Sequence, residues 1–192
     1  LCTDDFAGHL AHNCNLSVKA ICGLAAMAQL LEATGNAEKA AFYRAKAEEM
    51  TRQWEENALD GDHYRLAFDQ PGTWSMKYNM VWDKLLGLSL FSQKVYDLEL
   101  AYYKTRLRPY GIPLDSRSDY TKTDWEMWST KLFDDAEYTN AVVDAMWKYL
   151  SECYDRFPFP DLIFTTKHHD GFCMWDTAQT DYRITAEDCL FH

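Results

Sequence analysis

The stretch LSVKAICGLAAMAQLLEATGNAEKAAFYRAKAEEMTRQW, residues 16–54, decides the fold class. Apolar residues recur every three or four positions on both sides of Gly35, which is the spacing of an amphipathic helix. These apolar positions are Leu16, Ala20, Leu24, Met27, Ala28 and Leu31 before the glycine, and Ala40, Tyr43, Ala47, Met50 and Trp54 after it. Gly35 can end the first helix and Asn36 can cap the second, so the stretch predicts a helical hairpin.

The same unit of helix, turn and helix recurs along the chain. Further helical patterns cover residues 77–88 with 94–106, and residues 123–133 with 134–154. Between them we expect a short strand over residues 64–68 and a loop over residues 109–121. Three hairpins in succession predict an all-α fold, either part of an (α/α) toroid or a helical array.

The composition excludes several classes of protein. Hydrophobic residues make up 47% of the 192 residues, which is enough for a packed core and excludes wholesale disorder. The 19 basic and 30 acidic residues give a net charge of −11, so nucleic acid is not an expected partner. No uninterrupted run of about 18 apolar residues occurs, so no membrane span is expected. The six cysteines form no CxxC pair, and we expect free buried thiols.

The character of the sequence changes near residue 160. FPFPD, residues 157–161, closes the helical part, and LIFTT, residues 162–166, is a short β-like run. We therefore expect a helical domain over residues 1–161 and a short irregular, β-like tail over residues 162–192. Because no neighbouring strand is evident in the sequence, this tail is expected to be dispensable for the helical fold.

Asp4 and Asp5 are the first candidate catalytic residues. They lie in an aperiodic N-terminal loop before His12 and Asn13, and a carboxylate beside an imidazole can activate water as a general base. His12 and Asn13 are then candidate substrate contacts. The structural alternative is a cluster of turn and helix-capping residues. His9 and His12 lack an evident third ligand, so we expect no metal and no other cofactor.

Asp124 and Glu126 are the second acidic pair. They begin the helix expected over residues 123–133, where the helix dipole alone would favour acidic residues. The functional interpretation places them at the mouth of a toroid beside Trp125, a candidate substrate contact, where paired carboxylates can assist hydrolysis. We predict that both acidic pairs face one cleft, because loops on the same side of consecutive hairpins converge.

Three more residues are candidate substrate contacts. Arg117 could bind a polar substrate, or it could serve only as a structural partner of Asp115. Trp74 and Lys77 belong to a polar and aromatic patch where a loop enters a helix, and a structural role is the simpler interpretation. The sequence has no Gly-rich phosphate loop, GxSxG elbow or catalytic-cysteine signature.

Four segments of the sequence occur in the order of a known family. They are CTDDFAGHLAHNCNLSVKAICGLAAMAQLLEATGN, WSMKYNMVWDKLLGL, YGIPLDSRSDYTKTDWEMW and FPFPD. Over residues 1–161 the chain resembles the glutaminase A family of fungi and bacteria. The resemblance implies a six-hairpin, glycosidase-like (α/α) toroid, of which this chain would hold the later hairpins. It also implies an extracellular or periplasmic hydrolase that converts glutamine to glutamate and ammonia.

A second resemblance begins at residue 164. The segment FTTKHHDGFCMWDTAQTDYRIT resembles a strand-end motif of retaining α-L-fucosidases, which implies that His168 and His169 contact sugar. A (β/α)8 barrel needs about 250 residues, so the tail is not expected to be a working fucosidase. Two unrelated segments that meet without a linker suggest a chimera.

Taken together, these patterns predict a fragment of a glutaminase A-like hydrolase, in which carboxylates assist the attack of water on an amide or glycosidic bond. We expect it to be inactive alone, with two kinds of partner: a small-molecule or glycan substrate, and the missing remainder of the parent domain. The alternatives are a fragment of a fucosidase-related glycoside hydrolase and a non-catalytic helical module that binds glycans.

Overall fold

The computed structural model describes residues 2–4, 8–153 and 161–166. Its helices are α1 (Cys14–Ala33), α2 (Ala37–Ala58), α3 (Val81–Leu85), α4 (Gln93–Arg106), α5 (Thr123–Thr130) and α6 (Ala136–Glu152). The short strands are β1 (Cys2–Asp4), β2 (Gly8–His9), β3 (Leu59–Asp60), β4 (His63–Tyr64), β5 (Tyr120–Lys122) and β6 (Leu162–Phe164). Helices dominate the described chain, which confirms the predicted fold class.

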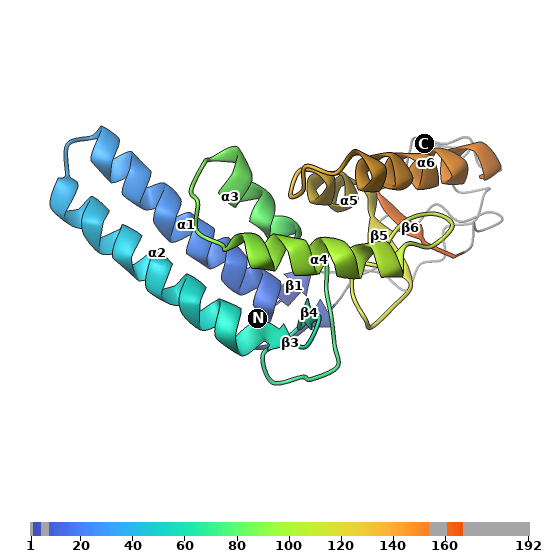
Figure 1. Ribbon diagram of the computed structural model, residues 1–192, viewed down its shortest axis with the longest axis horizontal. Coiled ribbons are helices and arrows are strands. Elements are labelled where there is room, and N and C mark those ends of the chain that lie inside the picture. The colour runs from blue at the N-terminus through green and yellow to red at the C-terminus, as the bar shows by residue number, and fades with distance from the viewer. Residues whose placement is uncertain (1, 5–7, 154–160, 167–192) are drawn as a thin grey trace, which may run out of the picture.

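The helices α1 and α2 form the antiparallel hairpin expected from the sequence, and they lie side by side at one end of the molecule (Figure 1). Asn13 caps α1 by accepting a hydrogen bond from the Leu16 N–H at 2.8 Å. Asn36 caps α2 in the same way, accepting from the Lys39 N–H at 3.4 Å. Gly35 between the helices has a φ of +80°, a backbone conformation that favours glycine.

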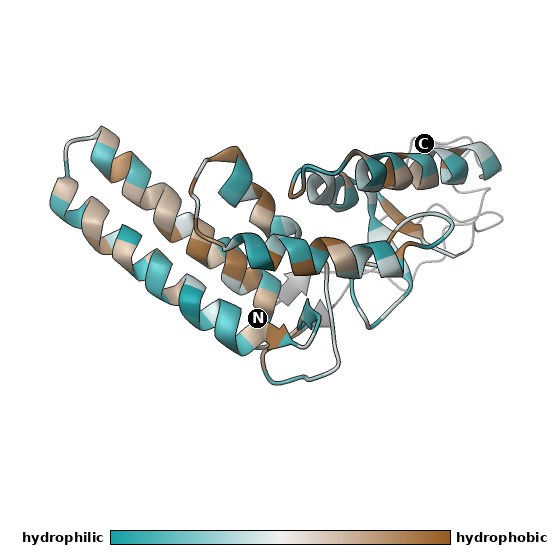
Figure 2. Cartoon of the chain, viewed as in Figure 1, coloured by the Kyte–Doolittle hydropathy of each residue, from teal (hydrophilic) through white to brown (hydrophobic). Residues whose placement is uncertain are grey.

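The two helices of this hairpin differ in surface character. Figure 2 shows long hydrophilic stretches on α2, whereas α1 is mostly tan and brown. Among the described helices, only α1 is long and apolar enough to cross a bilayer, although the sequence contains no uninterrupted apolar run. A helix that packs in a protein core meets the same criterion, and Val18 and Ile21 of α1 are buried here.

Two local predictions are wrong in extent. The helix expected over residues 77–88 is reduced to a 3₁₀ turn followed by the five-residue α3. The chain then reverses through Gly87 and Ser89, whose φ values are +60° and +54°. The strand expected over residues 64–68 is also misplaced, because β4 ends at Tyr64 and pairs with β3. Helices α4, α5 and α6 lie where the helical patterns predicted them.

Buried side chains form two main clusters. One joins α1, α2 and α4 and contains Trp54 and Val95. The other joins the segment before α3 to α4 and α6, and contains Met76, Tyr103 and Tyr138. Both clusters contain many aromatic side chains, and these large side chains supply much of the buried apolar surface.

Cys14 and Cys22 are buried in the first cluster as free thiols, as expected from the sequence. Burial raises the pKa of the Cys14 thiol to about 11 and the pKa of the Cys22 thiol to about 12. Both side chains therefore behave as small apolar groups rather than as nucleophiles.

The expectation that the β-like run after residue 161 has no partner is wrong. Strand β6 pairs antiparallel with β5, and Thr121 lies opposite Ile163. Ile163 is 1% exposed and packs with Tyr110 and Tyr149. The prediction considered only the parallel neighbours of a barrel strand, whereas the loop before α5 supplies an antiparallel one. This pairing crosses the boundary expected between Asp161 and Ile163.

Candidate functional site

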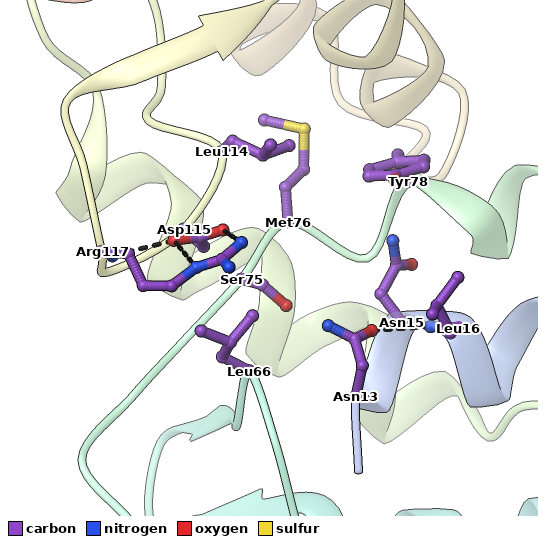
Figure 3. Close-up of a pocket in the computed structure, with 10 residues that line it drawn as sticks. All are labelled: Asn13, Asn15, Leu16, Leu66, Ser75, Met76, Tyr78, Leu114, Asp115 and Arg117. Carbon is purple, nitrogen blue, oxygen red and sulfur yellow. Dashed lines mark hydrogen bonds and ion pairs between the residues drawn. The ribbon is translucent and has the colours of Figure 1, made fainter. Parts of the chain in front are cut away.

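A small pocket lies at the N-terminal end of α1, where four segments of the chain meet (Figure 3). The Cys14 N–H donates to the Leu66 carbonyl at 2.9 Å, which joins the start of α1 to the loop after β4. The Met76 N–H donates to the Leu114 carbonyl at 2.8 Å, which joins the segment before α3 to the loop before β5. The pocket is thus built by backbone pairing between segments that are distant in sequence.

The pocket is narrow and mixed in polarity. Its volume of about 10 Å³ is room for roughly one water molecule. The residues that line it are Asn13, Asn15, Leu16, Leu66, Ser75, Met76, Tyr78, Leu114, Asp115 and Arg117. Of the residues predicted to form a site, the structure therefore brings Asn13 and Arg117 together.

Asp115 and Arg117 form an ion pair on one side of the pocket. Arg117 donates to Asp115 from its backbone N at 2.8 Å, from Nε at 3.0 Å and from Nη2 at 2.6 Å. Asp115 is 5% exposed, so the pair is shielded from water on the carboxylate side. The structural alternative raised from the sequence is therefore present, and it fixes the guanidinium at the pocket wall.

Two asparagines and a serine form the opposite side. Asn13 uses its Oδ1 to cap α1, and Asn15 uses its Oδ1 to accept a hydrogen bond from the Asn79 N–H at 3.2 Å. Ser75 is 5% exposed, and its hydroxyl has no hydrogen-bond partner among the residues that the structure describes. A buried hydroxyl without a partner is uncommon and indicates either a bound water or a ligand atom.

Lys77 does not reach the pocket, so its expected contact with substrate is not supported. Its side chain has no exposed surface, and Nζ donates to the Tyr64 carbonyl at 2.8 Å and the Ser75 carbonyl at 2.7 Å. Glu99 Oε2 lies 3.8 Å from Nζ. Burial lowers the pKa of Lys77 and raises that of Glu99, because removal from water disfavours the charged form of each group.

The two predicted tryptophan contacts lie in different surroundings. Trp74 is 7% exposed and packs edge-on against Tyr102, with 5.7 Å between ring centroids, so it belongs to the core. Trp125 is half-buried and stacks on Tyr78, with ring centroids 4.2 Å apart. Because Tyr78 lines the pocket, Trp125 supports one wall without lining the pocket itself.

Asp124 and Glu126 do not face a common cleft, contrary to the prediction. Asp124 is exposed, whereas Glu126 is completely buried under the loop before β5, where its Oε1 accepts a hydrogen bond from the Ile112 N–H. Each residue turns a helix by about 100°, so side chains two positions apart point to nearly opposite sides. Burial raises the pKa of Glu126 from 4.5 to about 8.

The remaining predicted residues lie near the N-terminus or outside the described residues. His12 is exposed, has a φ of +56°, and its Nδ1 lies 2.8 Å from Asp69 Oδ2. The backbone of Asp4 belongs to β1, while Asp5, His168 and His169 lie outside the described residues. In the described part of the chain, no group of three His, Cys, Asp or Glu residues is arranged to hold a metal ion.

Comparison with known proteins places this chain in a family. The family model for the glutaminase A six helical-hairpin domain matches residues 1–177. The chain belongs to this family. The match extends past residue 161 and includes β6, in agreement with the pairing of β6 with β5.

Two fungal relatives of this glutaminase A-family chain align with most of its length. Glutaminase A of Aspergillus oryzae is 34% identical over 167 residues, which is 85% of this chain and 24% of the relative. A probable glutaminase of Arthroderma benhamiae is 28% identical over 201 residues, which is 90% of this chain and 23% of the relative. The chain thus spans about a quarter of the length of these two relatives.

A shorter similarity points to another class of hydrolase. A putative α-L-fucosidase of Oryza sativa subsp. japonica is 36% identical over 67 residues, which is 34% of this chain and 12% of that protein. This similarity covers a minor part of both proteins.

Sequence inspection missed two residues of this family member's pocket. Asn15 and Ser75 carry no motif that marks them, since an asparagine at a helix start and a serine in a loop are common. The one available signal was position, because Asn15 follows the capping residue and Ser75 lies two positions before Lys77. Ser75 is held by the backbone bridge to Asp115, and Asn15 is held by its hydrogen bonds with Asn79.

Proposed function

We propose that this chain forms part of a glutaminase A-like hydrolase, in which carboxylates assist the attack of water on an amide bond. The observation that carries the proposal is the family match over residues 1–177, together with the polar pocket at the N-terminal end of α1. The choice of an amide substrate rests on the names of the two relatives, a glutaminase A and a probable glutaminase. The chemistry remains that of general base catalysis by carboxylates.

Among the acidic residues, Asp4, Asp5 and Asp124 are the proposed catalytic groups. Strand β1, which ends at Asp4, pairs with β2, and β2 ends at His9, five residues before α1 begins. Asp124 is exposed at the start of α5 and could meet a substrate in solvent. Glu126 has a different proposed role, since its enclosed carboxyl holds the loop at Ile112.

The experiment measures ammonia release from L-glutamine by the purified chain, beside Aspergillus oryzae glutaminase A. We expect no turnover above buffer by this chain alone, because the chain covers about a quarter of that relative and positioning contributes several kcal/mol to catalysis. In a longer protein that also contains the rest of the parent domain, Asp5→Asn and Asp124→Asn should reduce the rate to that of buffer, while Asp144→Asn on the exposed side of α6 should leave it unchanged. Ammonia release by the longer protein that is unchanged by Asp5→Asn and Asp124→Asn would refute the proposal, and turnover by this chain alone that Asp5→Asn abolishes would refute its expected inactivity.

A glycoside substrate is the second candidate, and the short fucosidase similarity favours it. Release of p-nitrophenol from p-nitrophenyl α-L-fucoside, without ammonia release from glutamine, would replace the first proposal by this one. Binding of glycans without turnover of either substrate would instead indicate a helical binding module. The extracellular or periplasmic location implied by the family resemblance is part of the same proposal.

We also propose that further helical hairpins of the same domain cover two apolar faces of this chain. Met27 and Leu30 on α1 are 45% and 63% exposed, and Trp147 and Leu150 on α6 are 68% and 43% exposed. Apolar surface of this kind marks an interface in soluble proteins. The six-hairpin family and the length of the relatives support a partner from the parent domain.

A further inference from the structure

Three hydrogen-bond donors that nothing else in the described chain uses converge on the pocket at the start of α1. They are the side-chain amide nitrogens of Asn13 and Asn15 and the hydroxyl of Ser75. All three residues are buried, with exposures of 6%, 5% and 5%. In Figure 3 the amide of Asn13 lies between the start of α1 and the Ser75 oxygen.

The orientation of the two amides follows from their other bonds. The oxygen of Asn13 accepts the Leu16 N–H and the oxygen of Asn15 accepts the Asn79 N–H. A backbone N–H can only donate, so the side-chain atom that it bonds must be the amide oxygen. The other amide atom, Nδ2, is therefore the one left without this hydrogen bond in each side chain. Within the part of the chain that the structure describes, neither nitrogen makes a hydrogen bond.

The charge around the pocket favours an incoming acceptor. Asp115 is the carboxylate in the wall, and Arg117 engages both of its oxygens through the guanidinium and backbone N–H. The N-terminal end of α1 contributes partial positive charge on the same side. The pocket therefore presents donors and a weakly positive potential to a group the size of one oxygen atom.

We propose that this pocket is a substrate subsite that binds one carboxylate or carboxamide oxygen of an amino-acid amide. The inference rests on the proposed hydrolase function and assigns Asn13, Asn15 and Ser75 as its donors. The main body of the substrate lies outside the pocket, because the cavity of about 10 Å³ admits only its oxygen. The guanidinium of Arg117 compensates the negative charge of Asp115, so this carboxylate does not repel the bound oxygen.

The sharpest variant is Asn13→Asp. Aspartate caps a helix as well as asparagine does, so the α1 cap survives, while the amide donor is replaced by a negatively charged acceptor. Asn36→Asp is the matched control, because Asn36 caps α2 through the same atom and does not line the pocket. Ser75→Ala removes the hydroxyl donor, and Ser151→Ala on the exposed end of α6 is its control.

The measurement is titration of the ¹⁵N-labelled chain with L-glutamine, followed by the side-chain amide signals of Asn13 and Asn15. Both signals should shift and saturate together. The dissociation constant should rise about tenfold in Asn13→Asp and about fivefold in Ser75→Ala, the range of one buried hydrogen bond. Both controls should bind as the unmodified chain does, and circular dichroism should give the same helical signal for all variants.

Two simple probes separate the possible sources of the oxygen. Acetate carries only a carboxylate and propionamide only a carboxamide, so the probe that shifts the same amide signals identifies the group bound. If L-glutamine and both probes leave the signals of Asn13 and Asn15 unmoved, the subsite does not exist. The same conclusion follows if Asn13→Asp and Ser75→Ala bind glutamine unchanged, or if a single water keeps its place in the pocket at saturating glutamine. Ammonia release is a separate readout, so failure of the subsite and failure of the hydrolase proposal are distinguishable.

Discussion

At the scale of single residues, Glu126 is predicted to be catalytic, but in the structure its buried carboxyl holds a loop in place. Its carboxyl is completely buried, and one of its oxygens, Oε2, has no hydrogen-bond partner in the described chain. Oε1 accepts the Ile112 N–H, and Gly111 lies directly against the carboxyl. An enclosed carboxyl of this kind costs free energy when it ionises, which explains its raised pKa.

The stability of the fold should fall with pH because of Glu126. The carboxyl has a pKa of 4.5 in the unfolded chain and about 8 in the fold, so the folded state binds the extra proton between these values. Its stabilising contribution is complete below the lower value and is lost as the pH rises to the upper one, at about 1.4 kcal/mol per unit. Glu126→Gln removes this titration.

We therefore expect the melting temperature of Glu126→Gln, relative to the parent, to rise between pH 5 and pH 8. Differential scanning calorimetry at both pH values measures this difference, and other buried groups such as Glu99 cancel because both proteins contain them. A constant difference at the two pH values would contradict the assignment.

Gly111 should tolerate no side chain. Its φ is +133°, and a Cβ there would lie 2.8 Å from Glu126 Cδ and closer to both carboxyl oxygens. We expect Gly111→Ala to lower the free energy of unfolding by at least about 3 kcal/mol. Gly61→Ala is the control, since Gly61 has a φ of +69° and open space around it, and its cost should be about 1 kcal/mol. Urea denaturation compares the two, and equal costs would mean that the contact with Glu126 is relieved by movement.

At the scale of elements, the pairing of β5 with β6 ties the end of the described chain to the loop that carries the pocket wall. The Thr165 N–H donates to the Asp119 carbonyl at 2.8 Å, and the Tyr110 N–H donates to the Thr165 carbonyl at 2.9 Å. The backbone groups of the strand are thus satisfied by this loop, as a buried strand requires. The helical part and β6 therefore share hydrogen bonds and a core cluster.

Ile163→Ala tests whether β6 contributes to the stability of the helical part. Ile163 is 1% exposed against Tyr110 and Tyr149, so the substitution leaves a cavity and should cost about 2–4 kcal/mol. Val143→Ala on α6, where the side chain is 42% exposed, should cost under about 1 kcal/mol. Thermal melts followed at the helical signal measure both. A melt unchanged by Ile163→Ala would restore the view that the tail is dispensable.

At the scale of the whole molecule, α1 and α6 both carry exposed apolar side chains, and the two helices lie toward opposite ends of an elongated arrangement (Figure 1). They cannot cover one another within this chain. Each face is therefore open to a second molecule, and association through such patches is the expected behaviour of the isolated chain.

The double variant Leu30→Lys with Trp147→Lys should reduce this association. Both side chains are more than half exposed, at 63% and 68%, so their replacement should leave the melting temperature nearly unchanged. Sedimentation velocity should show a weaker dependence on protein concentration than in the parent. The variant Glu38→Gln with Glu56→Gln changes the net charge equally on exposed sites of α2, and it should associate as the parent does. Equal association of all three proteins would refute the role of these faces.

The sequence by itself determined the helical class and the family of this chain. The helical spacing of residues 16–54, the glycine at position 35 and the asparagine at position 36 are local features, and local hydrogen bonds and backbone conformation express them directly. The ordered motifs of the chain identified the family that the domain comparison then matched over residues 1–177.

Tertiary structure alone decided which polar side chains meet. Periodicity marks the apolar face of a helix, yet it does not tell that Lys77 turns inward to Glu99, or that Glu126 is enclosed while Asp124 is exposed. The convergence of Asn13 and Ser75 on one pocket depends on backbone hydrogen bonds between segments far apart in the chain. Such long-range pairing is fixed by the packing of the whole chain, because each segment satisfies its backbone groups only when the others are in place.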